Sequence, residues 1–293
     1  MAVAFESVAT AAAGANNITI GKPTGLAAGD LMVAHLAASD SAAGAIDQWG
    51  SPGGTWTSLV TISSAPGAMT HRVEVFYKYA DAGDAAAADF TFTGDADSDA
   101  QLGAIYRISG AALAPTGAID AEPTTDTTPT YTNTVTPSYI NSLMLFLVSS
   151  GGDLSTQSVS GYAITTNNPT WTERYDLNQA GSTDGDVSLA GATASRPEAT
   201  ATGNSDCTLA EAPSTSVGVM VACYPLVSVT VSPAVVDATA TINAPTVTGG
   251  AAVSPAVVVV TPTINAATVT TAAPKWANTD KSSAPTWTNP DKS

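Results

Sequence analysis

Two histidines are the residues of this chain whose type most readily supports chemistry. His35 lies inside the apolar stretch 31–37, and His71 begins the next long stretch of alternating residues. A catalytic or zinc-binding histidine needs partners, and the chain has no cluster with zinc-ligand spacing and no Gly-x-Ser-x-Gly, Walker or dinucleotide motif. The sequence therefore predicts that both histidines are core or rim residues held by hydrogen bonds.

A run of alternating aspartates is the second chemical feature. The stretch GDADSDAQ contains Asp95, Asp97 and Asp99. Alternating aspartates in a loop can direct carboxylate oxygens at Ca²⁺, but the glycine and distal glutamate of an EF-hand loop are missing. Aspartate is also a common turn residue. A polar hairpin is the simpler interpretation and a calcium site the weaker alternative.

Paired carboxylates are the catalytic arrangement that the sequence leaves open. Glycoside hydrolysis needs two carboxyl groups across the scissile bond. Glu74, Glu173 and Asp176 fall in expected strands, but they are scattered along the chain without a pairing pattern. We therefore predict a protein that is not an enzyme, with no catalytic residue and no cofactor.

The elements that would position these groups are short strands, which fill residues 1–226. HRVEVFYKYA alternates, with Val73 and Val75 on one face and Glu74 on the other, whereas NSLMLFLVSS is apolar throughout. Such runs recur between clusters of Gly, Pro, Asp, Asn and Ser. AGDAAAADF is the nearest approach to a helix, and it could form one short turn. We predict an all-β fold whose first domain, residues 1–226, is a jelly-roll-like β-sandwich.

Charge and cysteine content restrict the partners and the compartment. Nine basic residues stand against 25 acidic ones, for a net charge of −16. Such a surface repels nucleic-acid phosphates and anionic lipids, so we expect no nucleic-acid or membrane partner. The N-terminal stretch lacks the basic region of a signal peptide, which favours a protein that stays in a cytoplasm. Cys207 and Cys223 are too few for a disulfide framework; two idle thiols are the default and a single bridge the alternative.

Residues 227–273 contain a tandem repeat with a period of 22 residues. VSPAVVDATATINAPTVT begins at Val231 and VSPAVVVVTPTINAATVT at Val253, and the copies agree at 14 of 18 positions. Valine and threonine favour extended backbone, while proline prevents central-strand pairing. We expect an extended linker or stalk that can pair with other chains. The expected assembly contacts in the repeat are Val235, Val257, Ile242 and Ile264.

The last segment, residues 274–293, repeats a tryptophan phrase after eleven residues. Trp276 and Trp287 occupy equivalent positions in PKWANTDKS and PTWTNPDKS. An indole left in water forgoes a large apolar contact area. We therefore predict that this tail anchors the protein by docking both rings into pockets, on another subunit or on this chain's own sandwich, with a disordered tail as the alternative.

Several phrases resemble a known protein family. They are ITIGKPTGLAAGDLMVAHLAAS, RVEVFYKYADAGDAAAADFTFTG, AIYRISGA and PTWTE. Together they are similar to jelly-roll-type β-sandwich domains of bacteriophage structural proteins and related bacterial surface proteins, and both C-terminal repeats resemble segments of phage virion proteins. The resemblance implies a virion protein of a tailed phage, such as a capsid decoration, head fibre or tail-associated protein. We therefore expect a protein that is made in the host bacterial cytoplasm and assembles with capsid or tail subunits as a homo-oligomer, for which a trimer fits stalk-like repeats.

The alternative function is a carbohydrate-binding or receptor-binding module at a cell or virion surface. Sandwich domains often stack aromatic rings against sugars. Trp49, Trp56 and Trp171 are the candidate glycan contacts. Packing of these rings in the core or at strand ends is the other interpretation of the same residues.

Overall fold

The computed structural model describes residues 2–14, 16–41, 46, 48–65, 69–94, 98–122, 126–154, 156–181 and 185–225. All of them belong to Met1–Val229, the first of the two units into which the chain divides. This part is an all-β sandwich with one short 3-10 turn, η1 (Pro52–Gly54), and one five-residue helix, α1 (Ala82–Ala86). The strands are β1 (Ala4–Ala13), β2 (Asn17–Gly21), β3 (Leu31–Asp40), β4 (Thr57–Ser64), β5 (Thr70–Tyr79), β6 (Asp89–Thr93), β7 (Ala100–Ser109), β8 (Ala111–Glu122), β9 (Thr130–Tyr131), β10 (Ser142–Gly152), β11 (Val159–Ile164), β12 (Thr172–Gln179), β13 (Asp186–Arg196), β14 (Ser205–Leu209) and β15 (Thr215–Pro225).

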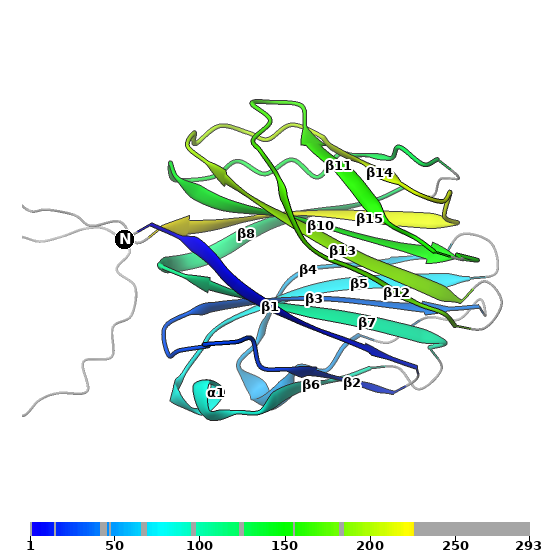
Figure 1. Cartoon of the computed structure of the whole chain (residues 1–293), viewed down its shortest axis with the longest axis horizontal. Helices are drawn as coiled ribbons and strands as arrows, with labels where there is room; N and C mark the ends of the chain where they lie inside the picture. Colours follow the sequence, from blue (N-terminus) through cyan, green and yellow to red (C-terminus); the bar gives the residue numbers. More distant parts are fainter. Residues whose placement is uncertain are drawn as a thin grey trace, which may run out of the picture. The chain divides into compact units, whose positions relative to one another are not determined.

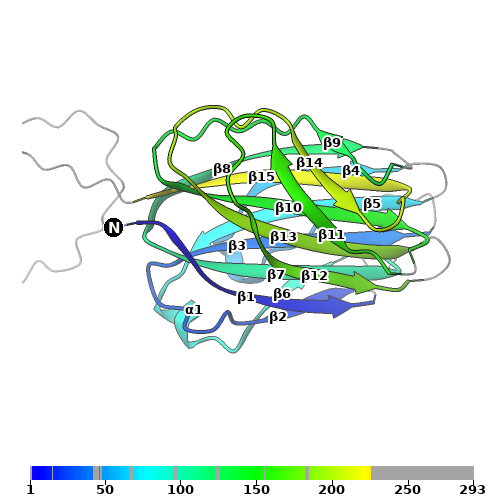
Figure 2. The same cartoon turned by 45° about the horizontal axis from the view of Figure 1, so that its top comes forward.

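The strands form four layers, which Figure 1 shows stacked from bottom to top. Two five-stranded antiparallel sheets face each other: sheet I in the order β1-β7-β3-β5-β4 and sheet II in the order β12-β13-β10-β15-β8. The β2–β6 pair and α1 cover the outer face of sheet I, and β9, β14 and β11 cover the outer face of sheet II (Figures 1 and 2). Since both sheets are covered on both sides, every residue of β3 and of β10 is buried.

The two sheets have the same strand order, and each is built from one half of the described part of the chain. Reading each sheet from its first strand, β1-β7-β3-β5-β4 corresponds to β8-β15-β10-β13-β12. The β2–β6 pairing likewise corresponds to β9–β14. Leu-Met begins the central strand β3 and follows the first residue of β10, and Thr-Trp-Thr leads into the edge strands β4 and β12. The described part of the chain is therefore an internal duplication whose two halves pack face to face.

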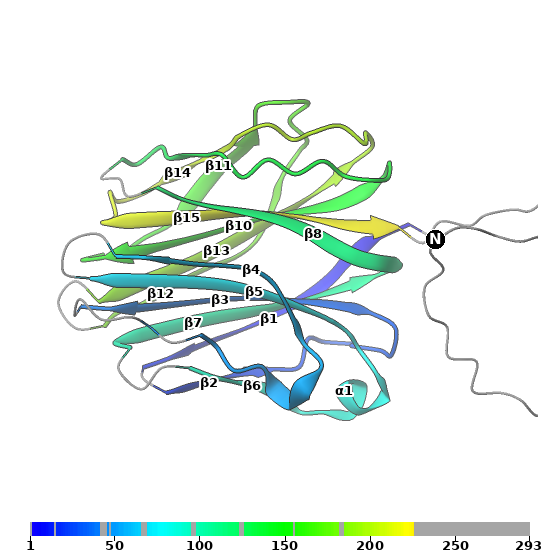
Figure 3. The same cartoon turned by 180° about the vertical axis from the view of Figure 1, so that it is seen from behind.

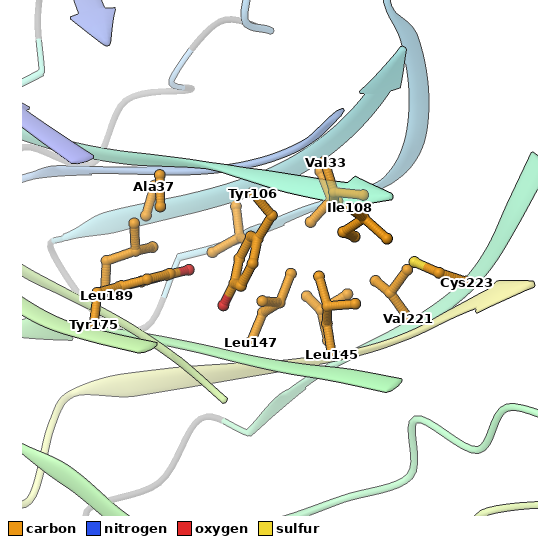
Figure 4. Packing of buried hydrophobic residues seen from close by; sticks show 14 of the residues in the cluster. Val33, Ala37, Tyr106, Ile108, Leu145, Leu147, Tyr175, Leu189, Val221 and Cys223 are labelled. Atoms are coloured by element: carbon orange, nitrogen blue, oxygen red, sulfur yellow. The ribbon is translucent and has the colours of Figure 1, made fainter. Parts of the chain in front are cut away.

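The main core lies between the two sheets, where Val33, Tyr106, Leu145 and Val221 meet (Figure 4). Two further clusters fill the outer layers: one between sheet I and β2–β6, the other between sheet II and the β9–β14–β11 sheet. Each fully buried Leu, Val or Phe contributes roughly 1.5–3 kcal/mol relative to an exposed one. The three apolar clusters together therefore stabilise the described part of the chain.

The alternation expected in HRVEVFYKYA is present, but both faces of the strand are buried from Thr70 to Phe76. Val73 and Val75 point into the main core and Phe76 into the outer cluster of sheet I. Glu74 therefore lies buried as well, and it forms an ion pair with Arg72 at 3.7 Å. A buried carboxylate requires such partners because burial without them is costly.

The helical turn expected in AGDAAAADF is α1, which begins with a capping box. The Asp81 carboxylate accepts from the Asp84 N–H, and Asp84 accepts from the Asp81 N–H. Lys78 then binds Asp84 at 2.7 Å, which holds the turn against β5.

Both cysteines are free and buried. Cys207 belongs to the outer cluster of sheet II and Cys223 to the main core, so sheet II separates them and the default of two idle thiols is confirmed. Burial raises the pKa of the Cys207 thiol to about 12 and raises that of Cys223 further. In the described ranges, no helix is long and apolar enough to span a membrane.

Candidate functional site

The two histidines lie in the main core and join the two halves. The Nδ1 atom of His35 on β3 is 2.9 Å from the hydroxyl of Tyr175 on β12. The Nε2 atom of His71 on β5 is 3.1 Å from the hydroxyl of Ser149 on β10. Burial lowers the pKa of His35 to about 3, with a contribution from His71, and lowers the pKa of His71 to about 4. Both rings are therefore neutral core residues at pH 7, as the sequence predicts.

Of the three aspartates proposed as weak calcium ligands, only Asp99 lies within the described residues. Its carboxylate accepts from the Ser41 N–H at 2.7 Å. Asp95 and Asp97 lie outside the described residues. Across the described ranges no group of three His, Cys, Asp or Glu side chains could hold a metal ion.

The residues predicted to make assembly contacts also lie outside the described residues, so their role stays a prediction. They are Trp276, Trp287, Val235, Val257, Ile242 and Ile264.

Two of the three candidate glycan contacts are core residues. Trp49 and Trp56 are only 5% and 8% exposed, and both belong to the outer cluster of sheet I. Trp56 stands edge-to-face against Phe90 and Phe92, with centroid separations of 5.8 and 5.3 Å. A ring packed in this way presents no face on which a sugar could stack. Both tryptophans therefore pack in the core, which is the other interpretation that the sequence left open.

Trp171 is different, because residues on both sides of it in the sequence line a pocket although its own ring does not. The ring is half-buried against Phe146 at 5.9 Å, and its Nε1 donates to the Asn168 Oδ1 at 3.0 Å. Residues 167–170 immediately before it form one wall of a pocket with a volume of about 760 Å³. This volume lies in the range typical of small-molecule sites.

Three segments distant in the sequence meet at this pocket. Residues 3–5 at the start of β1 form one side, and residues 167–170 between β11 and β12 form another. The end of β13 and the turn after it contribute from Thr193 to Glu198. The pocket therefore lies at the seam where β1 of sheet I meets β12 of sheet II.

Arg174 on β12 is the cation of the pocket. Its guanidinium carbon lies 3.9 Å from the centroid of the Phe5 ring, and its Nε donates to the Thr193 hydroxyl at 2.7 Å. Partial burial lowers the pKa of Arg174. The described residues offer no acceptor to its Nη1 and Nη2 atoms, so the outer edge of the guanidinium keeps its hydrogen-bonding capacity.

This open edge sets Arg174 apart from the other cations. Of the six lysines and arginines in the described ranges, three pair with carboxylates and two donate to backbone carbonyls. The paired residues are Arg72, Lys78 and Arg107, and the carbonyl-bound residues are Lys22 and Arg196.

A second arginine positions the wall of the pocket without entering it. Arg196 is fully buried, and its guanidinium donates to the carbonyls of Thr166, Thr200 and Ala201 at 3.1–3.3 Å. It thereby ties the loop after β11 to the turn after β13. Asn167, whose carbonyl lies 3.4 Å from the same guanidinium, adopts a left-handed φ of 49°, a conformation that asparagine tolerates better than most residues.

Hydrogen bonding also fixes the orientation of Asn168. Its Oδ1 accepts from the Ile164 N–H at 3.1 Å and from the Trp171 indole. Two donors on one atom identify it as the carbonyl oxygen, which leaves the amide NH₂ as a donor. Glu198 also lines the pocket and is half-buried, with no hydrogen bond or ion pair from any described residue.

The duplication provides an internal comparison for Arg174. The pairing register shifts between Glu173 and Tyr175 on β12 and at the equivalent place, between Ser58 and Val60, on β4. The residue at the bulge is Arg174 in one half and Leu59 in the other.

Each bulge residue packs on the first strand of the opposite half. Leu59 packs over Gly117 of β8, whereas Arg174 lies on Phe5 of β1. Figure 3 shows the seam between β4 and β8, on the opposite side of the sandwich from the seam between β1 and β12. A bulge redirects a side chain, and the fold accepts an apolar one here, so the arginine is not required by the architecture.

The chain matches no protein-family model, no curated protein and no solved structure.

Sequence reasoning did not identify Arg174, Arg196 or Asn168 as site residues. One signal could have done so: Thr-Trp-Thr occurs at 55–57 and again at 170–172, followed by Ser-Leu-Val in one copy and Glu-Arg-Tyr in the other. Aligning the copies places a charge where the first copy has leucine. The pocket itself could not be found this way, because its walls come from segments about 160 residues apart.

Proposed function

We propose that this chain is a non-catalytic structural protein of a tailed-bacteriophage particle. In this proposal the sandwich is the displayed or neighbour-binding domain, residues 227–273 are an extended stalk, and residues 274–293 are the anchor. The partners are other virion proteins and further copies of the chain. The sandwich is jelly-roll-like only in having two packed antiparallel sheets, because the strands of each sheet come from one half of the described part of the chain.

The observation that carries the proposal is that the sandwich completes its own core. Sheets I and II are covered on both faces by described strands, and the central strands β3 and β10 are buried along their whole length. The apolar residues of the two C-terminal repeats are therefore not required to fill this core. Repeated valines, isoleucines and tryptophans that the domain does not need support contacts with another surface.

Many copies on a symmetric particle make weak contacts sufficient. Each tryptophan phrase can contribute a modest affinity, and linked phrases add through effective concentration. The strongly acidic composition fits this arrangement, because like charge keeps unassembled copies apart in solution.

Incorporation into particles tests the proposal. We expect the double variant Trp276→Ala/Trp287→Ala, like deletion of 274–293, to reduce the copies retained on purified particles by about tenfold or more. The matched control is Ser282→Ala/Ser293→Ala, which changes the same two phrases but keeps both indoles. Equal retention of the tryptophan and serine variants would refute the anchoring role.

A second candidate function is supported by the pocket beside β12. A carbohydrate-binding or receptor-binding module needs a concave site with a few convergent polar groups. The open guanidinium of Arg174 and the amide of Asn168 are groups of this kind. This function is compatible with a place on a particle surface.

A further inference from the structure

We propose that the pocket beside β12 binds an acidic saccharide, with the sugar carboxylate held end-on by the Nη1 and Nη2 atoms of Arg174. This inference sharpens the second candidate function and is independent of the proposed anchoring role.

The negative charge of the chain makes a cation without a carboxylate partner, such as Arg174, a candidate anion-binding residue. With a net charge of −16, the protein repels anions over most of its surface. Each of the other described cations is engaged with a carboxylate or a carbonyl, whereas Arg174 keeps two terminal nitrogens without a protein acceptor. A planar guanidinium held by one hydrogen bond and one aromatic ring is pre-organised for a bidentate bond to a carboxylate.

The position of Arg174 increases the strength of such a bond. Its Nε is committed to Thr193, and the Phe5 ring covers one face of the guanidinium. The free edge is therefore the side opposite Nε, where both Nη atoms can donate to one carboxylate. Partial removal from water strengthens a charge-assisted hydrogen bond relative to the same bond at an exposed site.

The remaining polar groups favour a sugar over a simple anion. The Asn168 NH₂ is left as a donor because its oxygen is already occupied. The neighbouring Thr170 and Ser195 add hydroxyls, and Pro169 adds an apolar surface for a ring face. Together these groups can bond several ring hydroxyls, which acetate or chloride does not have.

Glu198 distinguishes the saccharide from phosphate. Its half-buried carboxylate lies in the same pocket without a protein partner. A doubly charged phosphate would be repelled by this group, whereas a carboxylate can accept from two hydroxyls of a neutral part of a sugar. The pocket therefore fits a monoanionic ligand rich in hydroxyls, and the opposite end of that ligand would lie towards Glu198.

The pocket is already shaped to receive a ligand. Arg196 fixes the loop before Trp171 to the turn that carries Glu198 through bonds to three backbone carbonyls. Since little ordering remains to be done on binding, a ligand would lose less free energy to immobilising the protein.

The test is a binding titration with the purified full-length chain. The probes are galacturonate, the matched neutral sugar galactose, acetate and inorganic phosphate, each raised to about 10 mM, since weak single sites have Kd values near the millimolar range. We expect galacturonate to bind at least about tenfold more tightly than each of the other three probes. Binding only by neutral sugar, equal binding of acetate or phosphate, or no binding of galacturonate would each overturn the proposal.

Substitutions then assign the binding to the pocket. We expect Arg174→Gln to weaken galacturonate binding by about 10- to 100-fold, since it removes a charge-assisted bidentate bond. Arg174→Lys keeps the charge and the stem, so it should fold normally and bind with intermediate affinity. Glu198→Gln should narrow the preference for galacturonate over inorganic phosphate, since it removes the carboxylate that repels a doubly charged anion.

Unchanged affinity in both Arg174 variants would overturn the assignment. Because the assay uses no particles, loss of binding here and loss of incorporation in the tryptophan variants are separate results. Either proposal can therefore fail while the other stands.

Discussion

Mild acid should weaken the contact between the two halves of the sandwich, because the two histidines bridge the sheets as neutral groups. His35 contacts Tyr175, and His71 contacts Ser149, in each case across the main core. The Nε2 atom of His35 has no hydrogen-bond partner among the described residues. Protonating the ring would therefore bury a charge and add a donor without an acceptor, which is costly.

The magnitude follows from the difference in pKa between the folded and unfolded chain. In the unfolded chain each histidine has a pKa near 6.5, whereas in the folded protein the pKa of His35 is about 3 and that of His71 about 4. Below pH 6.5 the unfolded chain therefore binds more protons, and stability falls as the pH falls. From pH 7.5 to 5.5 each histidine removes about 1.4 kcal/mol from the free energy of unfolding, or about 2.7 kcal/mol together.

Urea denaturation at pH 7.5 and 5.5, at constant ionic strength, measures this change. The variants His35→Gln and His71→Gln serve as internal controls, because glutamine keeps a polar group but does not titrate. Each single variant should lose about 1.4 kcal/mol between the two pH values, half the change of the unmodified chain, and the double variant should lose close to none.

Comparing variants also separates the histidines from the carboxyl groups. Burial raises the pKa of Glu74 and of Asp176, so these groups bind protons more readily in the folded chain and stabilise it as the pH falls. Their contribution is the same in every variant and cancels in the difference. If both single variants showed the same pH dependence as the unmodified chain, the histidines would not be the titrating groups and the reasoning would be wrong.

Three further predictions concern the core and the pocket wall. Arg196→Met should lower the free energy of unfolding by about 3 kcal/mol or more in urea titrations, since three part-buried hydrogen bonds from a fully buried guanidinium to backbone carbonyls are lost; a change below 1 kcal/mol would contradict it. Gly218→Ala should cost about 1–3 kcal/mol because its Cβ would overlap the Tyr131 ring, whereas Gly21→Ala, with open space around it, should change stability little; equal effects would contradict this. Cys207 and Cys223 should react with a thiol reagent at pH 8 only after denaturation, and fast labelling of the native chain would contradict their burial.

The sequence predicts the central strands well because their composition is extreme. The stretches that became β3, β5, β10 and β15 are long and apolar or alternate clearly, and each lies at or next to the centre of its sheet. The edge strand β1 is harder to recognise. It consists largely of alanine, serine and threonine, so the two faces differ little in hydrophobicity.

The alternating pattern does not show that both faces of β5 are covered. A strand with polar residues on one face usually exposes that face to water, yet Arg72 and Glu74 of β5 are both buried. The covering layer above them is formed in part by β2 and β6, two short strands that pair although Thr19 and Thr91, which face each other in the pair, are 72 residues apart in the sequence. No local pattern indicates that such strands will return to cover an outer face.

The candidate site was predictable only in part. Trp171 was identified by its residue type, but its importance lies in the loop before it and not in its ring. Arg174 carries no local signature, because a charged residue on an edge strand is ordinarily a solvated one. Its role depends on Phe5, which approaches only once both sheets have packed.

Because both copies of the strand arrangement lie in a single chain, the sequence of each copy can change without a change in the other. In a symmetric dimer of separate half-length chains, any substitution at the bulge would occur at both seams at once. A second arginine would then take the place of Leu59 and open the β4–β8 seam as well. The fused chain can hold one seam closed with an aliphatic side chain while the other acquires a new recognition chemistry, so stability and specificity can change independently.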